Sequence, residues 1–192
     1  MSNREPCSTG AIIWLTGLSG SGKTTLAQGA ATQLRTLGIE TAVVDGDVLR
    51  HGLCRDLGYS DNDRRENIRR AGEVAIAKAQ TGFVTFVALI SPFEDARAAV
   101  VRRAEQTSIP FGLVYVNATL ATCERRDPKG LYRLARCGKL PAFTGISSPY
   151  EPPIAPDLEL LTDVDPQLGS TEKLANFALS RLRVDSSFWT VI

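Results

Sequence analysis

The sequence predicts a single α/β domain over residues 1–192, with a mostly parallel five-stranded sheet, flanking helices and a mobile lid. Short apolar segments alternate with segments of helical periodicity, which is the pattern of a parallel sheet. A glycine-rich turn follows the first apolar segment, and a stretch rich in glycine and proline comes late in the chain. The length suits one domain with a sizeable core.

The first part of the chain predicts two strands and a helix. Residues 11–16 (AIIWLT) form an apolar run that stops at the glycines, as a buried parallel strand does. A helix is expected over residues 24–37, where alanine and leucine recur at helical spacing and Gly38 follows as a stop. Residues 41–44 predict the second strand, which ends in Asp-Gly-Asp at residues 45–47.

Three further strands and three helices are expected after this triplet. Ser60 and Asp63 have the spacing of a capping box, which opens a helix expected to end near residue 80. Short apolar runs predict strands, and apolar positions three or four residues apart predict helices. The remaining elements are strands at residues 83–89, 113–116 and 158–161 and helices at residues 93–106 and 168–182.

Residues 127–156 differ from the rest of the chain because glycine and proline recur throughout them. Glycine and proline interrupt helices and strands, and they are too frequent here for a helix or strand of the core. A long irregular stretch in a compact domain is usually a lid or a binding loop. We therefore expect this segment to be the mobile lid.

Charge and composition limit the classes of partner. The chain has 22 Lys and Arg against 21 Asp and Glu, a net charge of +1, so no nucleic acid partner is expected. No apolar run reaches the roughly 18 residues of a membrane span, and the first residues lack a signal peptide, so we expect a cytoplasmic protein without membrane contact. The four cysteines lie far apart, which predicts reduced thiols rather than zinc ligands or disulfides.

The glycine-rich turn matches the phosphate-binding pattern G-x-x-x-x-G-K-[ST] between a predicted strand and a predicted helix. Backbone N–H groups and the helix N-terminus would bind the phosphates of a nucleoside triphosphate. Lys23 would reach the β- and γ-phosphates, and the Thr24 hydroxyl would ligate Mg²⁺. The candidate ATP-binding residues are Gly17, Leu18, Ser19, Gly20, Ser21, Gly22, Lys23, Thr24 and Thr25.

Asp45 and Asp47 follow the second predicted strand, at the edge where α/β sheets bind ligands. Carboxylates in this place suit work on a metal-bound water and on a substrate hydroxyl. The alternative is that Asp47 only caps the next helix, which is a common role for Asp.

Basic residues gather in two segments. Residues 50–70 contain six arginines against four acids, and Arg64 and Asn67 are three apart on the predicted helix, so both would reach one anionic group. Residues 125–139 contain six cations and one acid. The alternative for both segments is a solvated charged surface.

Five segments resemble the adenylyl-sulfate kinase (APS kinase) family in their order and spacing over residues 12–161. They read GLSGSGKTT, DGDVLRHGLCRDLGYSDNDRRENIRR, ISPFEDAR, RDPKGLYRLAR and FTGISSPYEPP. The resemblance implies a three-layer P-loop kinase fold and transfer of the ATP γ-phosphoryl group, with Mg²⁺, to the 3′-hydroxyl of adenosine 5′-phosphosulfate in sulfate assimilation. It also implies a homodimer and suggests association with a sulfurylase.

The resemblance also implies roles for individual residues. The candidate catalytic residues are Lys23, Asp45, Asp47 and Lys129, and Arg125 joins the ATP-binding set. Asp45 would lie at the metal ion and hold it through water, and Asp47 would lie at the acceptor hydroxyl and take its proton. Around the acceptor, Arg50, Arg64 and Asn67 would bind the phosphosulfate, and Tyr59 and Phe143 would stack on the adenine. The rest of the substrate-binding set is Asp47, Ile90, Ser91, Lys129, Gly130, Leu131, Thr144 and Gly145. Ser91 matches a serine that some relatives phosphorylate, and we expect it near the site without being a required nucleophile.

This sequence departs from the family pattern at positions outside the phosphate-binding turn, the two aspartates and Arg64. Val48 stands where many relatives have Asn, and Leu134 where a basic lid residue is common. Two alternatives are a P-loop kinase for another small hydroxyl substrate and a non-catalytic nucleotide-binding partner of a sulfurylase. His51, the sole histidine, is a weaker candidate for the base, because it is expected to pack or to face solvent.

Overall fold

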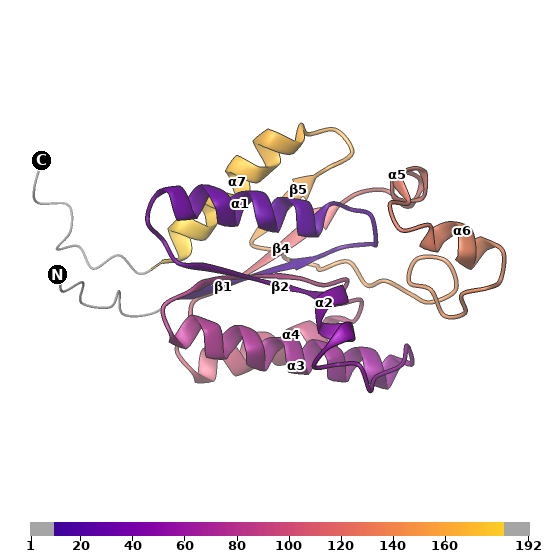
Figure 1. The fold of residues 1–192 in the computed structure, drawn as a ribbon, viewed down its shortest axis with the longest axis horizontal. Helices are drawn as coiled ribbons and strands as arrows, with labels where there is room; N and C mark the ends of the chain where they lie inside the picture. Colours follow the sequence, from indigo (N-terminus) through magenta and orange to yellow (C-terminus); the bar gives the residue numbers. More distant parts are fainter. Residues whose placement is uncertain (1–9, 183–192) are drawn as a thin grey trace, which may run out of the picture.

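The computed structural model describes residues 10–182 and places a five-stranded sheet between two layers of helices (Figure 1). The strand order is β2-β3-β1-β4-β5, and every neighbouring pair is parallel. The predicted α/β class and parallel sheet are confirmed. The strands are β1 (Ala11–Thr16), β2 (Thr41–Asp45), β3 (Val84–Ala88), β4 (Phe111–Asn117) and β5 (Leu158–Leu161).

Helices cover both faces of the sheet. On one face lie α1 (Lys23–Thr36) and α7 (Gln167–Arg181), and on the other lie α3 (Asp61–Gln80) and α4 (Glu94–Gln106) (Figure 1). All six residues of β1 are buried, because the central strand is covered on both sides. This layered core holds the carboxyl ends of the strands in a fixed array.

Alternate residues of β1 pack into different halves of the core. Ile12 and Trp14 belong to the cluster under α3 and α4, whereas Ile13 and Leu15 belong to the cluster under α1 and α7. Side chains of a strand point alternately to opposite faces, so a continuous apolar run such as AIIWLT is what a doubly covered strand requires.

The strand β4 is longer than predicted, since it begins at Phe111 and not at residue 113. Gly112 interrupts the apolar pattern, which is why the first residues of the strand were not predicted. A Cβ atom at Gly112 would lie 2.6 Å from the Phe177 ring of α7. The absence of a side chain at Gly112 therefore lets this ring pack against the sheet.

Two short helices occupy the carboxyl edge beyond β4. They are α5 (Leu120–Arg126) and α6 (Leu131–Arg136) (Figure 1). The prediction that residues 127–156 contain no core element is wrong in part, because Tyr132 and Phe143 are buried and meet edge to face with ring centroids 5.0 Å apart. The candidate lid therefore has a small apolar cluster of its own.

Two features of the described residues bear on the expectations from composition. No helix within residues 10–182 is long and apolar enough to cross a membrane. Cys54, Cys123 and Cys137 are free thiols, and burial raises the pKa of Cys54 and Cys123. Cys7 lies outside the described residues.

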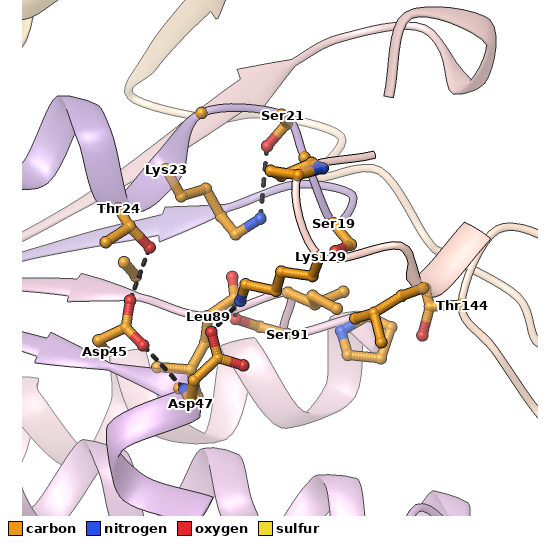
Figure 2. A pocket seen from close by; sticks show the side chains of 18 of the residues that line it. Ser19, Ser21, Lys23, Thr24, Asp45, Asp47, Leu89, Ser91, Lys129 and Thr144 are labelled. Atoms are coloured by element: carbon orange, nitrogen blue, oxygen red, sulfur yellow. Dashed lines mark hydrogen bonds and ion pairs between the residues drawn. The ribbon is translucent and has the colours of Figure 1, made fainter. Parts of the chain in front are cut away.

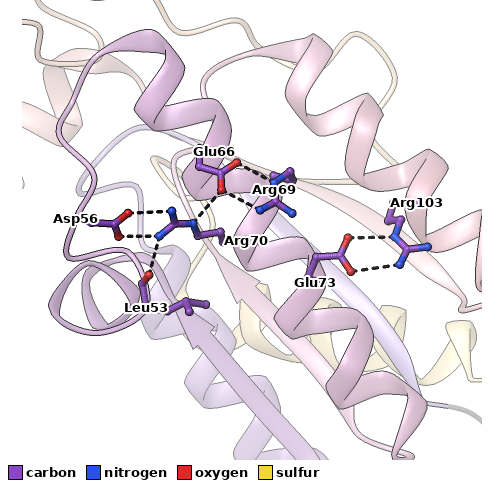
Figure 3. Close-up of polar contacts among 7 residues, drawn as sticks. All are labelled: Leu53, Asp56, Glu66, Arg69, Arg70, Glu73 and Arg103. Carbon is purple, nitrogen blue, oxygen red and sulfur yellow. Dashed lines mark hydrogen bonds and ion pairs between the residues drawn. The ribbon is translucent and has the colours of Figure 1, made fainter.

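Arginines of α3 brace the turn that follows α2 (Gly46–His51) (Figure 3). Arg70 donates two hydrogen bonds to the Asp56 carboxylate, at 2.7 and 2.9 Å, and one to the Leu53 carbonyl at 2.9 Å. Glu66 accepts from both Arg69 and Arg70. At the N-terminus of α3, Ser60 and Asp63 form the predicted capping box.

We expect Glu66→Gln to reduce the acid sensitivity of folding between pH 4.5 and 2. Hydrogen bonds from Arg69 and Arg70 lower the pKa of Glu66 from 4.5 to about 2. The carboxylate therefore stabilises the folded state fully above pH 4.5, and this contribution is lost as the pH falls toward 2. Urea unfolding across this range should show a steeper loss of stability in the wild type. Equal slopes for the two proteins would contradict the assignment.

Candidate active site

A cavity of about 850 Å³ opens at the carboxyl ends of the strands. Figure 2 shows Lys23 and Thr24 on one side of it, Thr144 on the other, and Asp47 and Lys129 between them. Nineteen of the sequence-predicted site residues line it: Ser19, Gly20, Ser21, Gly22, Lys23, Thr24, Thr25, Asp45, Asp47, Arg50, Tyr59, Arg64, Asn67, Ile90, Ser91, Lys129, Leu131, Phe143 and Thr144.

The glycine-rich turn between β1 and α1 needs glycine for two different reasons. Gly22, the N-cap of α1, is in the left-handed region with φ 103°, and nothing lies near the position of its missing Cβ. Gly17 lies against β4, where a Cβ would come within 2.4 Å of the Val116 carbonyl oxygen. The chain can therefore curl tightly over the end of the sheet and direct the N-terminus of α1 at the cavity.

Lys23 lies inside this turn with only 8% of its surface exposed. Its Nζ donates to the carbonyl oxygens of Gly17, at 2.9 Å, and Leu18, at 2.7 Å, and to Ser21 Oγ at 3.3 Å. Burial lowers the pKa of Lys23 from 10.5 to about 8. An anionic ligand in the turn would favour the charged form again.

Asp45 joins the turn to the helix that follows β2. Its Oδ2 accepts from Thr24 Oγ1 at 2.6 Å, and its Oδ1 accepts from the backbone N–H groups of Asp47, at 2.8 Å, and Val48, at 3.4 Å (Figure 2). Asp45 is thus the N-cap of α2. The alternative that Asp47 serves only as this cap is wrong, and its side chain lines the cavity instead.

Asp47 and Lys129 form an ion pair that joins β2–α2 to the candidate lid (Figure 2). Both side chains are about half exposed. Because exposed ion pairs contribute little to stability, this contact can open at small cost when a ligand competes for either partner. His51 lies one turn after Asp47 on α2, is exposed and does not line the cavity.

Arg64 and Asn67 share the buried face of α3 that the sequence predicted. Arg64 donates to the Tyr59 carbonyl at 2.9 Å, and also to Thr144 Oγ1 and the Ala142 carbonyl, so it links α3 to the candidate lid. Asn67 Oδ1 is buried and has no hydrogen-bond partner among the described residues. A buried acceptor of this kind favours a ligand that brings a hydroxyl or amino donor, while the Nδ2 group of the same side chain can donate to an anion.

An aromatic ring borders the same end of the cavity. The Arg50 guanidinium lies 4.3 Å from the centroid of the Tyr59 ring and donates to the Gly58 carbonyl at 2.8 Å. The Tyr59 side chain is exposed, whereas Phe143 is buried beside the cavity. This end therefore combines cationic groups with flat apolar surfaces, which suits an anionic ligand that carries a base.

Ser91 lies in the turn after β3, with 2% exposure and φ 44°. Its Oγ accepts from Trp14 Nε1 at 2.9 Å and donates to the Leu89 carbonyl at 3.3 Å. Ser91 lines the cavity, and its hydroxyl is already engaged in two hydrogen bonds.

The structure also brings residues to the cavity that sequence reasoning missed. Arg125 does not line it, and donates instead to Thr122 Oγ1, whereas the neighbouring Arg126 does line it. Of the other predicted residues, Gly17, Leu18, Gly130 and Gly145 lie outside the lining. The missed lining residues after β5 carry no recognisable motif, and they are Thr162, Asp165, Gln167 and Ser170.

Comparison with known proteins shows the family to which the chain belongs. A family model described as adenylylsulphate kinase matches residues 9–161. The chain belongs to the adenylylsulphate kinase family. An adenylyl-sulfate kinase of Bacillus licheniformis is 56% identical over 151 residues, which cover 79% of this chain and 76% of that protein. An adenylyl-sulfate kinase of Bacillus pumilus is 49% identical over 172 residues, 90% of this chain and 86% of its own.

A solved member of the adenylylsulphate kinase family has the same fold. The structure of the Mycobacterium tuberculosis APS kinase CysC in complex with AMPPNP and APS is 44% identical, with a TM-score of 0.85, and the match covers 90% of this chain and 98% of that one. The three-layer P-loop kinase fold that the sequence predicted is therefore confirmed.

Proposed function

We infer that this chain transfers the γ-phosphoryl group of ATP to the 3′-hydroxyl of adenosine 5′-phosphosulfate, giving 3′-phosphoadenosine 5′-phosphosulfate and ADP. The observation that carries this function is one cavity that is lined both by the phosphate-binding turn and by Arg50, Tyr59, Arg64 and Asn67. Such a cavity brings two nucleotides together, which phosphoryl transfer between them requires.

The turn at residues 17–24 would bind the ATP phosphates through its backbone N–H groups and the N-terminus of α1. Lys23 would move from the Gly17 and Leu18 carbonyls toward the β- and γ-phosphates. Arg126 and the lining residues after β5, Thr162 to Ser170, would bind the rest of ATP. Arg126 donates to the Gly20 carbonyl and Thr162 to the Ser21 carbonyl, so these residues lie beside the turn.

The residues present fit Mg²⁺. Thr24 Oγ1 and Asp45 Oδ2 lie 2.6 Å apart, and oxygen donors are the ligands that this ion prefers. Residues 10–182 contain no group of three or more His, Cys, Asp or Glu that would hold a metal, so most ligands would come from phosphates and water, with Asp45 acting through water. When bound, the ion would neutralise charge on the phosphate oxygens.

At the other end, Arg64, Asn67 and Arg50 would bind the phosphosulfate, while Tyr59 and Phe143 would contact the adenine. The acceptor 3′-oxygen would attack the γ-phosphorus in line, the bond from that phosphorus to the β–γ bridging oxygen would break, and the hydroxyl proton would pass to Asp47. Lys129 would leave Asp47 and bind the transferring phosphoryl group as the lid closes and excludes water.

Release of ADP in the presence of ATP and adenosine 5′-phosphosulfate, with and without Mg²⁺, tests this function. A panel of nucleosides and sugar acids as acceptors separates it from a P-loop kinase for another hydroxyl substrate. We expect turnover only with the sulfonucleotide and Mg²⁺. Turnover of another panel member alone would refute the acceptor assignment, and binding of both nucleotides without product would favour a non-catalytic partner of a sulfurylase.

Arg64→Ala should raise the KM for adenosine 5′-phosphosulfate by about 10- to 100-fold, the effect of losing a charged hydrogen bond in a buried site. The KM for ATP should stay within about twofold, because Arg64 binds Thr144, which lies across the cavity from Lys23 (Figure 2). Arg69→Ala, an exposed arginine on the same helix, is the matched control. An unchanged KM for the sulfonucleotide in a folded Arg64→Ala protein would contradict this placement.

We further propose that the chain is a single-domain cytoplasmic enzyme of sulfate assimilation that forms a homodimer and associates with a sulfurylase. Light scattering should then give a mass near twice the 20.7 kDa of the chain. A monomer at micromolar concentration would refute the dimer. Co-sedimentation with the sulfurylase of the same organism tests the association, and independent sedimentation of the two would refute it.

A further inference from the structure

Arg97, on the first turn of α4, is a buried arginine that does not line the cavity. It is 1% exposed. Its Nη1 donates to the Ser91 carbonyl at 2.6 Å, and its Nη2 donates to the Glu151 carbonyl at 2.6 Å and pairs with the Glu94 carboxylate. One side chain thus contacts two segments that lie 60 residues apart in sequence, the turn after β3 and the end of the candidate lid.

Other hydrogen bonds join the same two segments. The Glu151 N–H donates to the Pro92 carbonyl at 2.8 Å, and the Glu151 carboxylate accepts from the Glu94 N–H, at the N-terminus of α4, at 2.6 Å. Tyr150 Oη and Thr16 Oγ1 are 3.0 Å apart, and Thr16 Oγ1 donates to the Ile90 carbonyl at 2.7 Å. The lid therefore returns to the sheet directly against the turn that borders the cavity.

The turn itself is held in an uncommon backbone conformation. Ser91 has φ 44°, in the left-handed region that few residues other than glycine adopt. Such a conformation persists when the surrounding structure holds it in place. The Arg97 bond to the Ser91 carbonyl and the Trp14 bond to Ser91 Oγ hold it from two sides.

Stability alone does not account for a charge at position 97. Burial of a guanidinium is costly, and its Nε has no hydrogen-bond partner among the described residues. Its carboxylate partner Glu94 is 44% exposed, so the pair compensates the burial only in part. A well-packed apolar side chain of similar length would avoid this cost, but it would not donate to the two carbonyl groups.

We propose that Arg97 is a positioning residue for the acceptor end of the cavity, and this rests on the proposed function. Through the Ser91 and Glu151 carbonyls it fixes the turn at residues 90–92, which lines the cavity, relative to the residue where the lid rejoins the sheet. It makes the end of the lid a fixed anchor, so that movement of the lid is confined to the residues before it.

Arg97→Met and Arg97→Lys test the proposal, with Arg103→Met as a control. Arg103 lies on the same helix, is half exposed and pairs with Glu73 (Figure 3). Arg97→Met should raise the KM for adenosine 5′-phosphosulfate about 10-fold and leave the KM for ATP within twofold, because small displacements of a binding wall have large effects. Arg97→Lys, which keeps the charge and one donor position, should give an intermediate KM, and Arg103→Met should behave as wild type.

Hydrogen exchange of the Glu151 amide provides a measurement that needs no substrate. This amide donates to the Pro92 carbonyl, so Arg97→Met should speed its exchange about 10-fold while amides of β1 exchange as in the wild type. Faster exchange throughout the chain would show a merely structural role and overturn the proposal. So would a normal KM for the sulfonucleotide in the active Arg97→Met protein. If the wild type does not phosphorylate the sulfonucleotide, the proposed function fails, while the exchange result still decides whether Arg97 anchors the lid.

Discussion

Replacing Lys23 by Met is expected to lower kcat/KM by about 10³-fold or more, because the variant loses the one buried cation of the phosphate-binding turn. Its Nζ is held within a few ångströms of the backbone that would cradle the phosphates. Catalysis of phosphoryl transfer depends on positioning and charge stabilisation, so removal of this group should affect turnover more strongly than any other single change in the turn.

The same substitution should have little effect on the free energy of unfolding at pH 7. Burial lowers the pKa of Lys23 to about 8, which corresponds to a cost of about 3 kcal/mol for the charged form at neutral pH. Met removes this cost, but it leaves the Gly17 and Leu18 carbonyls without their donor, a loss of similar size. Lys23→Met should therefore lose activity while its free energy of unfolding stays close to that of the wild type.

The dependence of stability on pH gives a second signature of Lys23. Because the pKa is lower in the folded state than the usual 10.5, the folded protein binds fewer protons between about pH 8 and 10.5. The wild type should gain stability over this range as the pH rises, and Lys23→Met should lack this gain. Denaturant unfolding at several pH values measures the difference.

Lys78→Met is the matched control for these measurements, since Lys78 is an exposed lysine on α3 beside the Phe83 ring, away from the cavity. It should keep wild-type kcat and KM. A Lys23→Met protein that retained a tenth of the wild-type kcat/KM would contradict the role proposed for Lys23. A loss of stability as large as that of a core substitution would show that the burial cost of Lys23 does not offset the hydrogen bonds lost with it.

Local signals in the sequence predicted the parts of the fold that depend on local chemistry. The apolar run of β1 and the capping box at Ser60 are set by neighbouring residues, and the structure has both. By contrast, the start of β4 depends on the fit of Gly112 against Phe177, which lies 65 residues later. The residue pattern of one segment cannot predict a contact with a residue so far away in the sequence.

In the candidate site, too, local features were predicted from the sequence and features that depend on the path of the backbone were not. The spacing of Arg64 and Asn67 predicted that they share a face, because helical geometry is local. The path of the backbone decides which aspartate of the Asp45-Gly46-Asp47 triplet caps α2. It also decides whether Arg125 or Arg126 reaches the cavity, so sequence alone did not distinguish these neighbouring residues of the same type. The bridging contacts of Arg97 were not predicted for the same reason, since both acceptors are backbone carbonyls.

Asp47→Asn is expected to lower kcat by about 10²- to 10³-fold, the usual contribution of a general base, and to leave the affinity for ATP within about twofold. The amide keeps the size of the side chain and can still accept from Lys129, but it cannot take the hydroxyl proton. Because Asp45 and not Asp47 caps α2, the substitution should leave the helix intact. Asp56→Asn, an exposed carboxylate in the next turn of the chain, is the control and should keep full kcat.

A double-mutant cycle with Lys129→Met separates proton transfer from the ion pair. If Asp47 served only to hold Lys129, the double variant would be no worse than either single variant, because one broken contact would account for both losses. If Asp47 takes the proton while Lys129 stabilises the phosphoryl group, the two losses in log kcat should add to a large extent, since each group then acts on a different atom of the transition state. An Asp47→Asn protein that keeps more than half of the wild-type kcat would exclude the proton-acceptor role, and full non-additivity would assign Asp47 to positioning Lys129.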